Sequence, residues 1–324
     1  GLDGAGAGAI GYRVGQPGEG LRCMFHMMNE ARIAVGLAAA MLGMAGYEAS
    51  LDYARQRPQG RPITGAGKNA AAPQVRIIEH ADVKRMLLAQ KAYVEGALAL
   101  GLYCARLVDE QRTAAPAAAR EAALLLEVLT PVAKSWPSEW CLEANSLAIQ
   151  VHGGYGYTRD YKVEQLWRDN RLNPIHEGTH GIQGIDLLGR KVAMFDGAAF
   201  AAHGALLDAS ITRALDTSSA ALADALSIRL TRLRDVTASL LRVADPMARL
   251  ANASAYLEAF GHITVAWIWL EQVLALGDRD DDFARGKRQA ARYFMQWELP
   301  RADAWLDRLA DNDDTALAMR DDWF

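Results

Sequence analysis

Helical periodicity dominates this chain and limits the folds open to it. Apolar residues recur at helical spacing, with few Gly or Pro interruptions, over residues 21–56, 80–112, 116–150 and 160–170. The loops between these stretches are polar or rich in Pro and Gly. The only segment that predicts a β-strand is the AIGYRV run at 9–14, which precedes a Gly/Pro turn. We therefore predict an all-α fold built from long helices.

A second helical unit is predicted after residue 195, where the chain becomes richer in Ala, Leu and Asp. Its expected helices cover residues 197–214, 217–243, 246–277 and 281–299. Capping residues support these borders, because Asp216 suits an N-cap, Asp245 precedes a first-turn proline, and Gly277 suits a helix end. The predicted organisation is a short N-terminal segment with one strand and a linker, a first helical bundle and an accessory helical domain, at 1–20, 21–194 and 195–324.

Composition excludes several classes of partner. The 324 residues are 51% apolar with a formal net charge of -4, so the chain can bury a core but has no basic field for nucleic acid. Its three cysteines show no CxxC spacing, which predicts neither a disulfide framework nor a thiolate metal site and fits a reducing cytoplasm. The most apolar stretch, 260–277, contains His262 and Glu271, so we predict a core helix and no membrane span.

Residues 176–180 read HEGTH and match the HExxH pattern of zinc hydrolases. On a helix this pattern presents His176 and His180 to one zinc ion, with Glu177 as general base. The usual third ligand is missing, because Asp186 stands where the third histidine is expected and no glutamate occurs between Glu177 and Glu258. Neighbouring proline and glycine residues also argue against a long regular helix. A zinc hydrolase remains an alternative to a site without metal.

Three blocks surround the same glutamate: QVHGGYGYT at 150–158, VEQLWRD at 163–169 and IHEGTHGIQ at 175–183. In this order and spacing they closely resemble the C-terminal helical domain of acyl-CoA dehydrogenases. The resemblance continues upstream through MFHMMNEARIAVG at 24–36 and YARQRPQGR at 53–61. The Pro-Gln-Gly-Arg run and the extra domain after residue 195 are similar to the longer members of that family, including 3-methylthiopropanoyl-CoA dehydrogenases.

The resemblance implies FAD-dependent α,β-dehydrogenation of an acyl-CoA thioester to a trans-2-enoyl-CoA, with electrons passed to an electron-transfer flavoprotein. By resemblance, Glu177 is the base that removes the α-proton. That proton is only weakly acidic, so the carboxylate must be held against it in a dry pocket, where burial raises its pKa. The resemblance also implies that the backbone N–H of Glu177 and a ribityl hydroxyl of FAD polarise the thioester oxygen.

Further site residues follow from the same resemblance. It implies substrate contacts at Arg32 and Gly178, and FAD contacts at Arg57, Gln59, Gln150, Gly153, Gly154, Thr179 and Gly181. Glycine lets a cofactor approach the backbone closely, and an arginine fork suits the flavin pyrophosphate of a neighbouring subunit. The chain departs from the family pattern twice: the loop after Arg57 is one residue shorter and lacks an aromatic residue, and Asn29 replaces the aspartate before Arg32.

The resemblance implies two upstream domains, one helical and one of β-structure against which the flavin ring rests. The chain opens on GLDGAGAGA, without methionine or a targeting signal, so we expect an upstream portion or a separate chain to complete the site. Family members are dimers or tetramers, which predicts a homo-oligomer. The alternative is that this polypeptide is a helical assembly fragment without activity.

Overall fold

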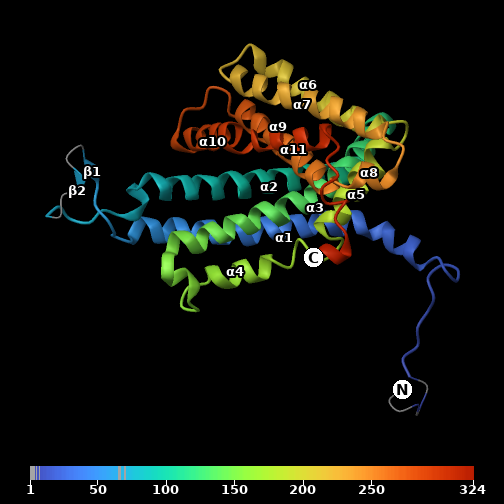
Figure 1. Cartoon of the computed structure of the whole chain (residues 1–324), viewed down its shortest axis with the longest axis horizontal. Coiled ribbons are helices and arrows are strands. Elements are labelled where there is room, and N and C mark those ends of the chain that lie inside the picture. The colour runs from blue at the N-terminus through green and yellow to red at the C-terminus, as the bar shows by residue number, and fades with distance from the viewer. Residues whose placement is uncertain (1–3, 5, 7, 65–66, 69–70) are drawn as a thin grey trace.

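Three long helices form the body of the molecule. The computed structural model describes residues 4, 6, 8–64, 67–68 and 71–324, so part of the predicted 1–20 segment lies outside the described residues. Helices α1 (Gly20–Gln56), α2 (Ala81–Thr113) and α3 (Pro116–His152) lie side by side, with α2 antiparallel to the other two (Figure 1). Pro116 occupies the first turn of α3, where its missing N–H costs nothing. The all-α prediction is confirmed.

The strand predicted at 9–14 is wrong for this chain. This segment runs away from the helices without regular structure (Figure 1), and Ile10, Tyr12 and Val14 are 78%, 89% and 75% exposed. An extended segment needs a neighbouring strand to satisfy its backbone groups, and the described residues offer none here. The strands found in the described part of the chain are a two-residue pair in the α1–α2 connection, β1 (Ile63–Thr64) and β2 (Gly67–Lys68).

Shorter helices continue the chain. After α3 a 3₁₀ segment leads into α4 (Val163–Asn170), which packs against α1 and α3, and a loop then leads to α5 (His180–Gly189). The rest of the chain covers the other side of the three-helix body (Figure 1). It comprises α6 (Ala198–Leu215), α7 (Ala220–Leu241), α8 (Pro246–Leu250), α9 (Ala253–Leu276), α10 (Asp282–Tyr293) and α11 (Arg301–Ala310).

The predicted helix borders needed correction in this second half. The stretch 246–277 is two helices separated at residues 251–252, and Asp245 caps the first by accepting from the Met247 and Ala248 N–H groups. The stretch 281–299 leaves α-geometry after Tyr293 and continues as a π-helical turn to Glu298. This helical segment ends before Pro300, and α11 begins directly after it, since proline fits the start of a helix.

Helix α9 joins the two halves into one core. The Trp269 indole donates to the Ala92 carbonyl of α2 at 3.1 Å, and a Cβ added at Gly261 would lie 2.6 Å from the Trp136 ring of α3. The buried apolar residues of both halves form one continuous cluster that extends along the chain from Ile33 to Leu309. Close interdigitation of this kind makes a core sensitive to added or removed volume.

Two helices in the described part of the chain, α1 and α9, are long and apolar enough to cross a bilayer by length and composition alone. In α9, 72% of the apolar window is buried inside the bundle. In α1, a Cβ added at Gly36 would lie 1.7 Å from the Ala133 carbonyl oxygen of α3, so the two backbones are in direct contact. Both helices therefore pack as core helices of the bundle.

Candidate functional site

The loop between α4 and α5 holds Glu177 in an unusual backbone conformation. Two hydrogen bonds shape the loop, from the His176 N–H to the Leu172 carbonyl and from the His180 N–H to the Pro174 carbonyl, at 3.3 and 3.1 Å. Between them Glu177 has a φ of 54° and Gly178 a φ of 92°. A side-chain-bearing residue in this left-handed region is strained unless its surroundings fix it, and such strain is concentrated at functional sites.

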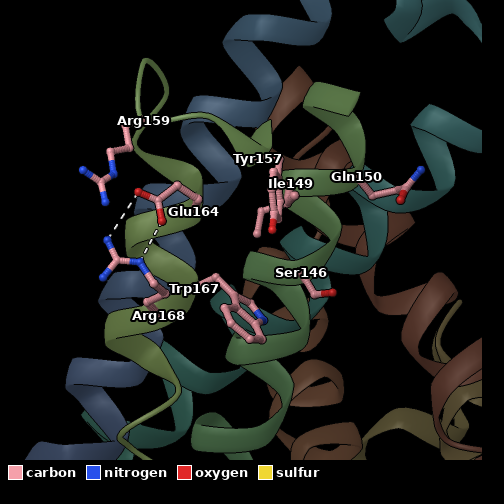
Figure 2. Close-up of a pocket in the computed structure, with 8 residues that line it drawn as sticks. All are labelled: Ser146, Ile149, Gln150, Tyr157, Arg159, Glu164, Trp167 and Arg168. Atoms are coloured by element: carbon pink, nitrogen blue, oxygen red, sulfur yellow. Dashed lines mark hydrogen bonds and ion pairs between the residues drawn. The ribbon is translucent and has the colours of Figure 1, made fainter. Parts of the chain in front are cut away.

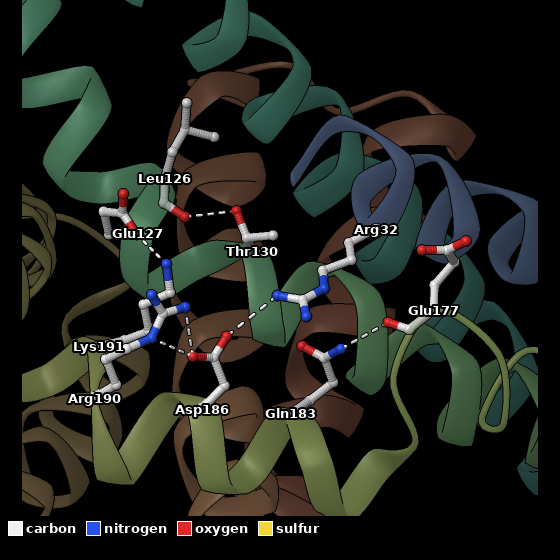
Figure 3. Close-up of polar contacts among 9 residues, drawn as sticks. All are labelled: Arg32, Leu126, Glu127, Thr130, Glu177, Gln183, Asp186, Arg190 and Lys191. Carbon is white, nitrogen blue, oxygen red and sulfur yellow. Dashed lines mark hydrogen bonds and ion pairs between the residues drawn. The ribbon is translucent and has the colours of Figure 1, made fainter. Parts of the chain in front are cut away.

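Gln183 supplies that support, a role that was not predicted from the sequence. Its side chain is fully buried, and its amide donates to the Glu177 carbonyl at 2.9 Å (Figure 3). A Cβ at Gly178 would lie 2.5 Å from the same amide nitrogen, so only glycine fits there without displacing it. Gln183 is the last residue of the IHEGTHGIQ block, and it lies in the first turn of α5, directly after the strained loop. Its place in that block was the only hint of this role in the sequence.

The backbone N–H groups of this turn are available to a ligand. Among the described residues, no acceptor for the N–H of Glu177 or Gly178 is present. Thr179 caps α5 by accepting from the Ile182 N–H, and a Cβ at Gly181 would meet only the Ser254 hydroxyl, at 3.8 Å. The Glu177 side chain itself is exposed, so the dry pocket expected around it is not formed by the described residues.

Arg32 lies next to this loop but is already partnered. Its side chain is buried in the bundle, and its guanidinium lies 3.2 Å from the Asp186 carboxylate, which also binds Arg190 at 2.8 Å (Figure 3). Asp186, which stands where the zinc pattern would have its third histidine, therefore holds an arginine. The Arg32 Nε atom is buried without a partner. Asp186 contacts Nη1 of Arg32. The predicted substrate contact would therefore have to use the other guanidinium nitrogens.

A buried lysine, also missed from sequence, lies beneath the loop. The Lys134 ammonium of α3 donates to the Asn173 carbonyl at 2.7 Å, and Lys134 is fully buried. Burial lowers the pKa of Lys134 to about 8; the Arg32 charge adds to this effect, while the Glu139 and Glu177 carboxylates oppose it. Chains of buried amides connect the same loop to α1 and α3, through Asn173, Asn170 and Asn145.

The other predicted FAD contacts gather where α1 and α3 end. The Arg57 guanidinium lies over the Tyr155 ring at 5.2 Å, and its Nε atom is buried without a hydrogen-bond partner in the described part of the chain. Gln59 is exposed and held through its backbone, donating to the Val75 carbonyl and accepting from His80. Gly153 has a φ of 63°, and a Cβ at Gly153 or Gly154 would meet nothing within 4 Å. This end therefore presents open backbone beside an arginine.

Gln150 lines a groove of about 770 Å³ between α3 and α4. Figure 2 shows its walls, with Ile149 and Ser146 on α3, Trp167 on α4, and Tyr157 from the connecting segment. On α4, Arg168 is held by the Glu164 carboxylate at 2.7 Å (Figure 2). The groove thus combines aromatic faces with charged groups along its length.

The predicted site residues form two separate groups in one chain. Glu177, Gly178, Thr179, Gly181 and Arg32 lie near the start of α5, whereas the remaining five lie at the far end of the three-helix body (Figure 1). From Arg32 to Arg57 the distance along α1 is roughly 37 Å at 1.5 Å per residue. The structure therefore does not bring the predicted FAD contacts together within a single chain.

The helical geometry that a zinc site would need is absent from the HEGTH segment. Helix α5 begins only at His180, so His176 and His180 do not follow each other on one helical face. His176 contacts the Asn173 side chain at 3.0 Å, while the His180 ring contacts the Glu258 carboxylate at 3.0 Å. Within the described residues no group of three or more His, Cys, Asp or Glu side chains could hold a metal ion.

Comparisons with known proteins bear on both halves of the chain. The family model described as acyl-CoA dehydrogenase, C-terminal domain, matches residues 18–192, and the one described as acetyl-CoA dehydrogenase C-terminal like matches 198–320. The chain is 36% identical to the 3-methylmercaptopropionyl-CoA dehydrogenase of Ruegeria pomeroyi, over 95% of this chain and 53% of the relative. It is 30% identical to the broad-specificity linear acyl-CoA dehydrogenase FadE5 of Mycobacterium tuberculosis, over 91% and 51%.

Solved structures agree on the fold. The chain is similar to an acyl-CoA dehydrogenase complexed with FAD from Bacillus anthracis, with a TM-score of 0.75 at 18% identity, over 94% of this chain and 52% of that one. It is also similar to ACDH-11 of Caenorhabditis elegans in complex with C11-CoA, with a TM-score of 0.70 at 20% identity, over 94% and 50%. The chain spans about half the length of the curated relatives it matches. Because one family model covers more than half of its residues, the chain belongs to the acyl-CoA dehydrogenase family, whose C-terminal helical portion it carries.

Proposed function

We propose that this chain supplies the catalytic base and part of the flavin contacts of an FAD-dependent acyl-CoA dehydrogenase. The observation that carries the proposal is the strained Glu177–Gly178 turn. It presents a carboxylate and two backbone N–H groups that have no acceptor among the described residues. A base and an oxyanion-binding N–H on one residue suit proton abstraction next to a thioester carbonyl. The acyl-CoA-binding relative ACDH-11 and the FAD-binding relative from Bacillus anthracis support this assignment.

The residues present fit the cofactor. At the Arg57 end, a buried Nε atom without a partner lies beside backbone at Gly153 and Gly154 that has room for a ligand. A guanidinium with open glycine backbone is the donor set expected for a pyrophosphate. Arg57, Gln59, Gln150, Gly153 and Gly154 would hold the nucleotide part, and Thr179 and Gly181 would face the flavin part. When bound, FAD supplies the hydride acceptor.

The chemistry assigned to this chain is a proton transfer. The Glu177 carboxylate takes the proton from the carbon α to the thioester, while the C–H electron pair forms the new double bond and the β-carbon loses hydride. The Glu177 N–H donates to the thioester oxygen, where negative charge develops. In this proposal Gly178 lies against the thioester, and its backbone N–H is the second donor of the turn. We propose that the electrons pass on to an electron-transfer flavoprotein and that the enzyme is cytoplasmic.

The separation of the two site groups supports a homo-oligomer. Because they lie roughly 37 Å apart along α1, a single cofactor meets the Glu177 end of one chain and the Arg57 end of another more readily than both ends of one chain. We propose that the upstream portion, on the same polypeptide or a separate one, covers the exposed Glu177 side chain and completes the pocket.

The test is anaerobic addition of saturated acyl-CoA to the FAD-loaded complete protein. We expect the visible flavin absorbance to bleach and the trans-2-enoyl-CoA to form, with butyryl-, octanoyl- and 3-methylthiopropanoyl-CoA compared as substrates. A complete protein that stays colourless after incubation with FAD, or a flavoprotein that none of these thioesters bleaches, would favour the alternative of an assembly subunit without activity.

A further inference from the structure

Helix α5 is in direct contact with residues 198–320, the C-terminal-like domain. A Cβ at Gly184 of α5 would lie 2.5 Å from the Ala253 carbonyl at the start of α9, and a Cβ at Gly189 would lie 3.3 Å from Leu250. The backbones of α5 and α9 therefore touch without intervening side chains. A displacement of α9 cannot occur without moving α5, because close-packed elements transmit such shifts.

Glu258 of α9 binds the first residue of α5. The Glu258 carboxylate lies 3.0 Å from Nε2 of His180 and accepts a hydrogen bond from the Trp140 indole at 2.9 Å. The Glu258 and His180 side chains are only 16% and 18% exposed. A second carboxylate, Glu139 of α3, lies 3.6 Å from Nδ1 of the same ring. The imidazole is thus held between α3 and α9, three residues after Glu177.

Several charges set the ionisation of this pair. For His180, burial acts against the charged form, but the Glu258 and Glu139 carboxylates outweigh burial and the Lys134 charge, so the pKa is raised. For Glu258, burial acts against ionisation, but the His180 and His262 rings and the Trp140 indole outweigh it, so the pKa is lowered. An imidazolium–carboxylate pair is therefore the favoured state of a site with little access to solvent.

We propose that Glu258 is a positioning residue for the catalytic turn. Through His180 it fixes the first turn of α5, and thereby the strained backbone at Glu177 whose carbonyl is bound from the next turn by Gln183. The C-terminal-like domain is then part of the active-site support and not merely a cover for the bundle. This inference rests on the proposed function of Glu177.

The variant that isolates this role is Glu258→Gln in the FAD-loaded complete protein. Glutamine keeps the size of the side chain and an acceptor for Trp140, but removes the charge that holds His180. The matched control is Glu271→Gln on the same helix. The Glu271 carboxylate also has polar partners, but these are Ser210 and Arg213 of α6, within the same domain as α9. Substitution at either position removes one carboxylate from α9.

We expect kcat of Glu258→Gln to fall on the order of tenfold, since small misplacement of a reacting group is costly, with KM changed less than about twofold. Hydrogen exchange at the N–H groups of His180, Ile182 and Gln183 should accelerate, because local opening becomes easier. The NMR titration midpoint of His180 should move to lower pH. Glu271→Gln should match the wild type in all three measurements.

Unchanged exchange at these three N–H groups in Glu258→Gln, or a kcat equal to that of the control, would overturn the inference. A failure of the proposed function has a different signature, because the wild type itself would then bleach no flavin. In that event the exchange and titration measurements still decide whether Glu258 positions the turn.

Discussion

At Glu177 the backbone occupies a conformation that costs about 1–3 kcal/mol for a residue with a side chain. The neighbours that fix it are identifiable: Gly178 continues the left-handed turn, and the buried Gln183 amide binds the Glu177 carbonyl. The strain is therefore supported by two residues of the same motif. The contribution of each of these residues to the turn can therefore be tested by a single substitution.

Replacing Gly178 with alanine should disrupt this unit. The new Cβ would lie 2.5 Å from the Gln183 amide at a φ of 92°, so we expect a loss of about 1–3 kcal/mol in the free energy of unfolding. Urea unfolding measures the change. Gly181→Ala is the control, because that position has ordinary helical backbone with open space, and its stability should equal or exceed that of the wild type. Equal losses in the two variants would contradict this account of the turn.

Lys134 should give the molecule a distinctive pH dependence. Its pKa falls from 10.5 to about 8 on folding, so between these values the unfolded chain binds a proton that the native protein lacks. The free energy of unfolding of the wild type should therefore rise, relative to Lys134→Met, as the pH increases from 8 to 10.5, and the difference should be constant below 8. Urea unfolding across this range checks the sign. Parallel stability curves for the two proteins would contradict a lowered pKa of Lys134 in the folded protein.

The linear motif identified Glu177 and its neighbours because their chemistry is local in the sequence. Lys134 and Glu258 could not be found in that way. Lys134 reaches the loop through Asn173, 39 residues later, and Glu258 reaches His180 from a helix of the second half. Nothing in the periodicity of either helix distinguishes these residues from other polar positions, since the helix register does not say which neighbour each will face.

At the scale of elements, the decisive contact is that of α5 with α9. Glycine at 184 permits it, because any Cβ there would meet the Ala253 carbonyl. Sequence reasoning treated the glycines of this region as evidence against a long regular helix, and Gly178 does lie before the helix, at positive φ. Gly181 and Gly184, in contrast, lie within the ten-residue helix α5. The cost of glycine in a helix is outweighed here by the close approach that it allows.

The substitution Gly184→Ala tests this contact. The added Cβ would lie 2.5 Å from a backbone oxygen, so we expect over-packing to cost about 1–3 kcal/mol of stability. Gly286→Ala on α10 is the matched control, since a Cβ there meets nothing and should stabilise by about 0.4–1 kcal/mol. Thermal unfolding monitored by circular dichroism separates the two. A Gly184→Ala protein as stable as the control would show that α5 and α9 are not in tight contact.

Long helices were predictable because their apolar periodicity persists over many turns, as for α1, α2 and α3. The interruptions of the helices in the second half of the chain were not predictable in this way. The apolar periodicity shows neither the break at 251–252 nor the π-helical turn after Tyr293, because it continues through both. The strand predicted at 9–14 was wrong for a different reason, because a strand forms only beside a partner strand.

At the scale of the whole molecule, the two segments that match separate family models share one hydrophobic core. The apolar cluster includes residues of the three-helix body and of α6 to α11, with α9 packed against both. A chain built in this way should unfold as a cooperative unit. Calorimetry should show a single transition whose van't Hoff and calorimetric enthalpies agree. Two resolved transitions would mean that residues 18–192 and 198–320 are energetically independent.

The central claim is that Glu177 removes the substrate proton, and one variant tests it most directly. In the FAD-loaded complete protein, Glu177→Gln keeps the size and hydrogen-bonding capacity of the side chain but lacks a basic carboxylate. We expect flavin content and acyl-CoA binding to be retained, and the rate of anaerobic flavin bleaching to fall by about 10²–10⁴-fold. Glu121→Gln, at an exposed position of α3, should bleach at the wild-type rate. Bleaching by Glu177→Gln at the wild-type rate would contradict the account.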